Sequence, residues 1–166
     1  MLDEAGMRFA IDDARVRHKA LADLIYFLDQ QALRLLGLYV SVGLAAAAAA
    51  ITGFSSKSPI THAAGLALGA ASICLSVGCL FCFWTMKPAA MSLPGRDAQF
   101  WLWANNDSVP HTEMFEQYLK NLDAKTTANL ELNENSAIAF GRAKLCGVLA
   151  PLAALGVGVV ALLLGA

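Results

Sequence analysis

Three long stretches of the sequence carry no charged side chain, and they limit the fold more than any other feature. They cover residues 35–54, 63–84 and 145–166. Each has roughly the 20 residues that a helix needs to cross about 30 Å of hydrocarbon. Because hydrocarbon offers no hydrogen-bond partners, the backbone of a spanning segment must pair within itself, which favours helices. The sequence therefore predicts an all-α integral membrane protein with three transmembrane helices.

The positively charged residues predict how these spans are oriented. Five Lys and Arg residues precede the first span, Lys57 alone lies between the first and the second, and six lie between the second and the third. Cytoplasmic segments of membrane proteins carry an excess of such residues. We therefore expect the N-terminus and residues 85–144 on the cytoplasmic side of the membrane, and the C-terminus at its outer side.

The chain is thus expected to have four parts. Residues 1–34 form a cytoplasmic N-terminal helix, and residues 35–84 form a two-span transmembrane hairpin. Residues 85–144 form a cytoplasmic helical insert, and residues 145–166 form the third transmembrane helix. The short turn "GFSSKSPITH" between the first two spans leaves no room for a domain and makes them antiparallel.

The N-terminal part shows a seven-residue apolar repeat that is typical of an amphipathic helix. No helix-breaking residue follows it, so we expect one continuous helix that enters the membrane. His18 interrupts the repeat, either as a tolerated polar residue between helices or as a proton switch. Arg8, Asp12 and Arg15 fall off the repeat and suit a solvated face. The repeat consists of Ile11, Ala14, His18, Leu21, Ile25, Leu28, Ala32 and Leu35.

Small residues and thiols inside the spans have ordinary structural interpretations. Gly65 and Gly69 form a GxxxG pattern, which lets helix backbones approach closely, either within one chain or between copies. Cys79 and Cys82 form a CxxC inside a span without His or Asp beside them. A zinc site needs four converging ligands, so we expect these thiols to pack as small hydrophobic groups and no metal to bind.

The cytoplasmic insert holds one short aromatic segment, "AQFWLW", between Gly and Pro residues that break the chain. It is expected to form a short helix. Phe100, Trp101 and Trp103 favour the headgroup region of a bilayer, where amphipathic rings are enriched. They could equally stack on a nucleotide base, so both interpretations stay open.

A polar interruption marks the long helix that we expect from Thr112 to the end of the chain, with Pro151 as a kink. Its apolar stripe turns polar at Asn129 and Asn133, which face one way. Each amide offers a donor and an acceptor to a base or ribose, which makes these two asparagines the candidate ligand-binding residues. The alternative is a solvated or interhelical polar face. The stripe runs through Phe115, Leu119, Leu122, Thr126, Asn129, Asn133 and Phe140.

Several function classes are not indicated. The sequence has no paired catalytic carboxylates, nucleophile with a histidine base, HExxH or phosphate-binding glycine loop, so we expect neither an enzyme nor a cofactor. The net charge is −1 and both signs mix, so no basic stripe indicates nucleic acid as a partner. The spans contain no Asp, Glu, Lys or Arg, which argues against transport of protons or ions.

The order of these parts resembles the membrane effectors of the Pycsar anti-phage systems. The resemblance covers the N-terminal helix ending in "YFLDQQALRLLGLYVSVG", the two-span hairpin and the helical insert. It continues through "FEQYLKNLDAKTTANLELNENSAIAFGRAKLCGVL", which leads into the final span. The "GRAK" before that span, with Arg142 and Lys144, is similar to the basic stop in the family.

The resemblance implies a function in antiviral defence. A partner pyrimidine cyclase would make cyclic UMP or cyclic CMP on infection, and the effector would respond by impairing the inner membrane. The cell would then die before phage matures, which is abortive infection. A nearly complete switch needs a preference of about 5.5 kcal/mol for the open state, so a homo-oligomer that binds several ligands is expected.

Two other functions stay open. A holin-like lysis protein would also have about three spans, but it would collapse the membrane without any nucleotide. A passive scaffold subunit of a larger membrane complex would be non-toxic and would copurify with its partner. The residue pattern alone does not separate these alternatives.

Overall fold

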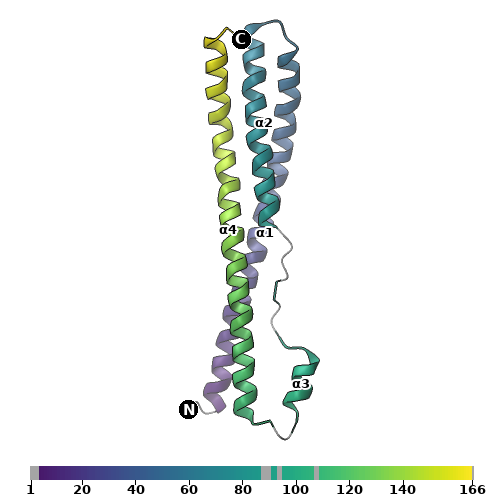
Figure 1. Ribbon diagram of the computed structural model, residues 1–166, viewed down its shortest axis with the longest axis vertical. Coiled ribbons are helices and arrows are strands. Elements are labelled where there is room, and N and C mark those ends of the chain that lie inside the picture. The colour runs from purple at the N-terminus through teal and green to yellow at the C-terminus, as the bar shows by residue number, and fades with distance from the viewer. Residues whose placement is uncertain (1–3, 87–90, 93–94, 107–108, 166) are drawn as a thin grey trace. The chain divides into compact units, whose positions relative to one another are not determined.

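The computed structural model describes residues 4–86, 91–92, 95–106 and 109–165. These residues form four helices and no strand: α1 (Glu4–Phe54), α2 (Pro59–Thr85), α3 (Ala98–Ala104) and α4 (His111–Leu163) (Figure 1). The predicted all-α class is confirmed. By length and composition, α1, α2 and α4 can each cross a membrane, so the three predicted spans lie in three separate helices.

Two of the helices are unusually long. The N-terminal repeat and the first span both belong to α1, which has 51 residues, as the lack of a breaker predicts. The insert and the last span are likewise joined in α4, which has 53 residues and contains Pro151. The predicted short aromatic helix is α3, and the Asp97 carboxylate caps it by accepting a hydrogen bond of 3.0 Å from the Phe100 N–H.

The chain folds into two compact units. We call the first the polar unit, which comprises Met1–Phe27 and Pro88–Glu134. We call the second the span unit, which comprises Leu28–Lys87 and Asn135–Ala166. Both α1 and α4 contribute to each unit, α2 belongs to the span unit, and α3 belongs to the polar unit.

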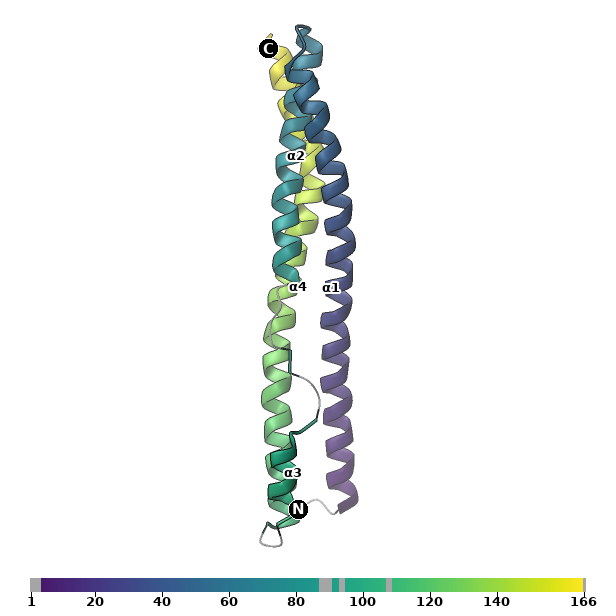
Figure 2. The same ribbon diagram turned by 90° about the vertical axis from the view of Figure 1, so that its right-hand side faces the viewer.

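In the span unit, α1, α2 and α4 run side by side around Tyr39 (Figures 1 and 2). The ring of Tyr39 lies between two glycines, because a Cβ added at Gly78 or at Gly147 would collide with it. The Tyr39 hydroxyl donates a hydrogen bond of 2.9 Å to the Ala143 carbonyl oxygen. Cys82 is fully buried in the same core and Cys79 packs against it, as the packing interpretation of these thiols predicts.

The predicted hairpin between α1 and α2 closes over residues 55–58. Beside it the backbones touch, since a Cβ added at Gly53 would lie 2.6 Å from the Gly65 Cα. Gly69 faces Ala50 and Phe54, which also belong to α1. Both glycines of the GxxxG pattern therefore face a helix of the same chain, which is the first of its two interpretations.

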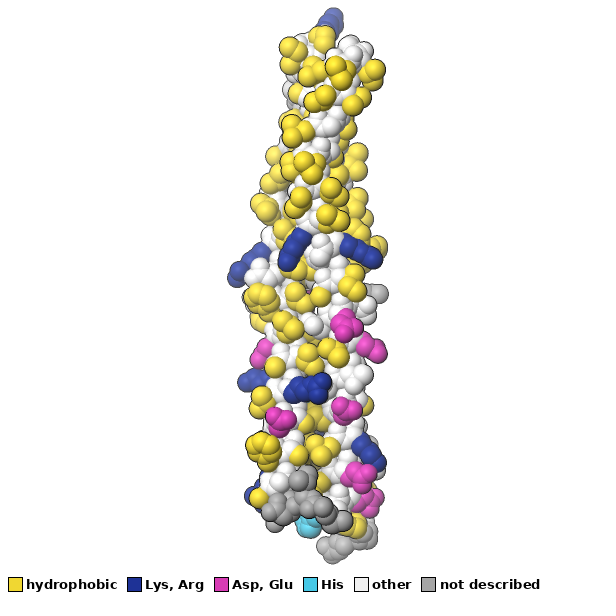
Figure 3. Space-filling model, turned by 90° about the vertical axis from the view of Figure 1, so that its left-hand side faces the viewer, with side chains coloured by type: hydrophobic (Ala, Val, Ile, Leu, Met, Phe, Trp, Pro, Cys, Tyr) yellow, Lys and Arg dark blue, Asp and Glu magenta, His cyan; other side chains and the backbone are white. Residues whose placement is uncertain are grey.

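The outer surface of the span unit is apolar. Large hydrophobic side chains stay exposed along all three helices, as at Ile73, Leu155 and Leu163. Figure 3 shows one face of the molecule on which hydrophobic side chains cover the span unit. A surface of this kind suits lipid, which solvates apolar groups as well as a protein core does.

Candidate ligand site

Two of the three polar side chains in the middle of the α4 stripe are buried. Thr126 and Asn129 are buried between Leu122 and Phe140, which are also buried. The predicted repeat on α1 is buried or half-buried at every one of its positions, and His18 has no exposed surface. Polar side chains therefore form part of the interior of the polar unit, where each requires hydrogen-bond partners.

His18 joins α1 to α4 and to the segment that follows α2. Its Nε2 lies 2.9 Å from the Ser92 carbonyl oxygen, which can only accept, so Nε2 carries the hydrogen. Its Nδ1 lies 3.2 Å from the Thr126 hydroxyl oxygen, and that hydroxyl is also 2.7 Å from the Leu122 carbonyl oxygen. These contacts support the interpretation of His18 as a polar residue between helices. The proton switch stays a prediction.

Asn129 also binds the backbone of Ser92. Its Nδ2 donates to the Ser92 carbonyl oxygen at 3.1 Å, and its Oδ1 accepts from the Ser92 N–H at 3.1 Å. We call His18, Thr126, Asn129 and Ser92 the Ser92 clasp. Because Oδ1 and Nδ2 of Asn129 both bind the Ser92 backbone, this side chain has a structural role in the clasp.

Asn133, the second candidate, has a different environment. Its Oδ1 is buried and has no hydrogen-bond partner among the described residues. The structure therefore does not place the two asparagines in equivalent settings, although they lie four residues apart on α4. Ligand binding by Asn129 and Asn133 stays a prediction.

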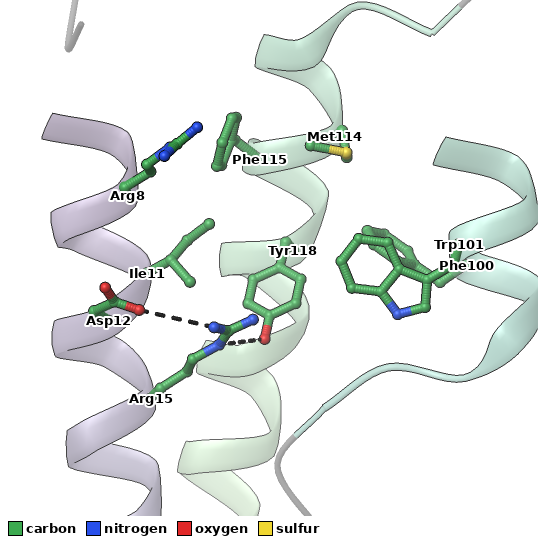
Figure 4. A pocket seen from close by; sticks show the side chains of 9 residues that line it. All are labelled: Arg8, Ile11, Asp12, Arg15, Phe100, Trp101, Met114, Phe115 and Tyr118. Atoms are coloured by element: carbon green, nitrogen blue, oxygen red, sulfur yellow. Dashed lines mark hydrogen bonds and ion pairs between the residues drawn. The ribbon is translucent and has the colours of Figure 1, made fainter. Parts of the chain in front are cut away.

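A separate cavity lies near the start of α1 and α4 (Figure 4). We call it the arginine–aromatic pocket. Its volume is about 340 Å³, within the range of roughly 300 to 1,000 Å³ that is usual for small-molecule sites. Neither candidate asparagine contributes to it. The pocket is lined by Arg8, Ile11, Asp12 and Arg15 of α1, Phe100 and Trp101 of α3, and Met114, Phe115 and Tyr118 of α4.

Contacts with Tyr118 and Asp12 orient Arg15 in this pocket. Its Nε donates a hydrogen bond of 2.8 Å to the hydroxyl oxygen of Tyr118, which is buried. Its guanidinium carbon lies 5.1 Å from the centre of the Tyr118 ring, and Nη1 lies 3.7 Å from the Asp12 carboxylate. Figure 4 shows Arg15 reaching from α1 toward Tyr118 on α4. The lining contains two arginines and one aspartate, so its formal charge is +1.

The aromatic wall of the pocket comes from α3 and α4. The Phe100 ring centre lies 5.3 Å from that of Trp101 and 6.1 Å from that of Tyr118. On Phe100 rests the guanidinium of Arg96, 4.1 Å from the ring centre, and Arg96 Nη2 donates to the Gln117 carbonyl oxygen at 2.9 Å. Trp103 contacts Phe100 but does not line the pocket. The insert thus gives two of its three named aromatics to one cavity.

The sequence pattern identified Phe100 and Trp101 but not the two arginines that line the same pocket. Arg8 and Arg15 fall on the expected solvated face of α1, and nothing local indicates that α3 and α4 meet that face. One signal was present: Arg8 and Arg15 are seven residues apart, so they lie on the same side of the helix. The predicted apolar stripe on α4 did not include Tyr118. This residue is buried more deeply than its neighbours Phe115 and Leu119, which the stripe did include.

Metal binding finds no support in the described part of the chain. No group of three or more His, Cys, Asp or Glu side chains converges among those residues. The four cysteines are free thiols and all lie in the span unit. Comparison of the sequence with protein-family models and with curated proteins, and of the fold with solved structures, found no match.

Proposed function

We propose that the protein is a membrane effector that binds a small cytosolic ligand and in response impairs the bacterial inner membrane. One observation carries this proposal. The two long helices that line the arginine–aromatic pocket, α1 and α4, are also the helices that contain the first and third candidate spans. A ligand that changes the contacts between α1 and α4 in the polar unit acts on elements that continue as spans.

The ligand in this proposal is a cyclic pyrimidine nucleotide, either cyclic UMP or cyclic CMP, supplied by a partner cyclase. The resemblance to the Pycsar effectors implies this ligand, and the chemistry of the pocket is compatible with it. Arginine is the preferred partner of phosphate groups, and aromatic rings stack on bases of any sequence. With the N-terminus in the cytoplasm, the polar unit faces the compartment in which such a nucleotide is made.

The effect on the membrane is proposed to need several copies. A ligand favours the open state over the closed state only by the difference between its binding free energies to the two states. A nearly complete switch needs a difference of about 5.5 kcal/mol. Several sites in a homo-oligomer reach that value more easily than one. An exposed glycine in the first span supports close contact between copies, since a Cβ added at Gly37 would meet nothing within 4 Å.

The experiment that tests this function follows membrane potential in bacterial cells. The chain is expressed together with an active pyrimidine cyclase, and a potential-sensitive dye reports depolarisation. Parallel cultures carry an inactive cyclase or lack the chain. We expect depolarisation only where both the chain and the active cyclase are present at confirmed levels.

Two outcomes would contradict the proposal. Depolarisation that is equal with the active and the inactive cyclase is the behaviour of a holin-like protein. An intact membrane potential with a raised nucleotide level and normal expression is the behaviour of a passive scaffold.

A further inference from the structure

The free edge of Arg15 faces a cavity of small-molecule size. Its Nε is engaged with the Tyr118 hydroxyl, and its only other polar contact among the described residues is the 3.7 Å ion pair of Nη1 with Asp12. That separation is too long for a hydrogen bond. The Nη hydrogens of Arg15 thus remain available to an anionic acceptor, while the Tyr118 contacts keep the guanidinium in place.

Trp101 offers a flat apolar surface to the same cavity. The residue lines the pocket and is half exposed, at 49% of its full surface. The indole is supported by Phe100, with ring centres 5.3 Å apart, and by Tyr118 at 6.5 Å. An aromatic ring entering the pocket can therefore stack on an indole that already has a fixed position.

We propose that the arginine–aromatic pocket binds a small planar anion, in which an aromatic ring stacks on Trp101 and an attached phosphate or similar group binds Arg15. The net positive lining favours an anion, and the volume of about 340 Å³ suits a molecule of mononucleotide size. This inference rests on the proposed function for the identity of the ligand as cyclic UMP or cyclic CMP. It assigns the site to Arg15 and Trp101 and leaves the Ser92 clasp as a structural element.

Binding can be measured on the full chain in lipid nanodiscs by the fluorescence of Trp101. Trp84 and Trp103, the other two tryptophans, are changed to Phe so that Trp101 is the only indole. The probes are cyclic UMP, cyclic CMP, uridine and inorganic phosphate. We expect saturable quenching by at least one cyclic nucleotide, with uridine and phosphate each at least about tenfold weaker, because each lacks one half of the ligand.

Matched variants locate the site, with binding followed by equilibrium dialysis and folding by circular dichroism. Arg15→Gln is expected to weaken binding about tenfold or more, as is usual when a hydrogen bond to a charged group is lost. Arg17→Gln, on the same helix but outside the pocket, is expected to bind normally. Trp101→Ala is expected to weaken binding by about fivefold or more, and Leu102→Ala, its exposed neighbour on α3, is not.

The outcomes separate the site from the function. Unchanged affinity in folded Arg15→Gln overturns the site, as does the absence of binding of every probe to the folded chain. Loss of binding in Arg15→Gln but not in Arg17→Gln supports the site even if cells with an active cyclase keep their membrane potential, a result that would defeat only the proposed function. Cyclase-dependent depolarisation that persists unchanged in Arg15→Gln supports the function and overturns the site.

Discussion

The polar unit and the span unit use the same two long helices, yet different groups hold each unit together. In the span unit the helices approach at glycines, and the ring of Tyr39 fills the slot between Gly78 and Gly147. In the polar unit the helices are joined by buried polar side chains, with His18 and Asn129 both bonded to Ser92. One helix pair thus changes its mode of packing along its length.

The surroundings explain this difference. In hydrocarbon, burial of an apolar side chain gains little, so close packing and a few hydrogen bonds hold helices together. In water, apolar burial stabilises the fold, but every buried polar group must find a partner. The span unit should therefore be most sensitive to added atoms, and the polar unit to lost hydrogen-bond partners.

The largest effect is expected from a methyl group added where two backbones touch. In Gly53→Ala the new Cβ would lie 2.6 Å from the Gly65 Cα, which cannot move without α2. Overpacking costs about 1 to 3 kcal/mol, and this site belongs at the upper end because the obstacle is backbone. Reversible denaturation in mixed micelles measures the loss. Gly156→Ala, where a Cβ meets nothing within 4 Å, should be neutral or slightly stabilising. Equal losses in both variants would contradict this account of the span unit.

The second effect concerns a lost partner in the polar unit. Asn129→Leu removes both hydrogen bonds to Ser92 and leaves the N–H of this half-buried residue without the Asn129 acceptor. We expect a loss of about 2 kcal/mol in the free energy of unfolding, together with faster hydrogen exchange at the Ser92 amide. Asn135→Leu, at an exposed position of α4, is the control and should change neither quantity by a comparable amount. Unaltered exchange at Ser92 would show that the clasp does not hold this segment.

Substitution of Asn133 should change the free energy of unfolding in the opposite direction to substitution of Asn129. Asn133→Leu removes an Oδ1 that is buried and has no partner among the residues that the structure describes, so we expect it to stabilise the fold by about 1 kcal/mol. The same denaturation experiment compares it with Asn129→Leu. If both substitutions destabilise the protein alike, Asn133 makes an interaction that its position does not reveal.

The smallest expected effect depends on pH. Burial raises the pKa of Asp29 above its ordinary value of 3.8. The folded state thus holds this proton more tightly than the unfolded chain, and stability falls as pH rises from 3.8 through the folded pKa. Asp29→Asn should therefore slightly raise the melting temperature at pH 7 and lose this advantage below pH 3.8. An equal gain at both pH values would exclude a titration effect.

The elements of the fold were predictable because their signals are local. Uncharged stretches of membrane length predicted the spans, "GFSSKSPITH" predicted the hairpin turn, and the absence of a breaker predicted the continuity of α1. Such signals come from neighbours in the chain, so a single sequence contains them. The GxxxG pattern identified Gly65 and Gly69 as helix contacts. The contacts of Gly78 and Gly147 with Tyr39 were not predictable, because these two look like the other glycines of the spans.

The candidate site was less predictable because its contacts are distant in sequence. Asn129 was identified from the change in its stripe, but its partner is a backbone group at Ser92, and backbone groups carry no sequence signal. Arg15 and Tyr118 are 103 residues apart, and their hydrogen bond depends on how α1 and α4 pair. A polar residue within an apolar repeat or stripe indicates that it has a hydrogen-bond partner, but not which residue that partner is.

Leakage from liposomes that contain only the purified chain tests the central claim most directly. The vesicles hold a self-quenched dye, and cyclic UMP or cyclic CMP is added at rising concentrations to the wild type and to Arg15→Gln. The account predicts no leakage without nucleotide, saturable leakage of the wild type with one of the two, and a response of Arg15→Gln displaced to about tenfold higher concentration or more. Leakage that is the same with and without nucleotide, or none at nucleotide concentrations that saturate binding, would contradict it.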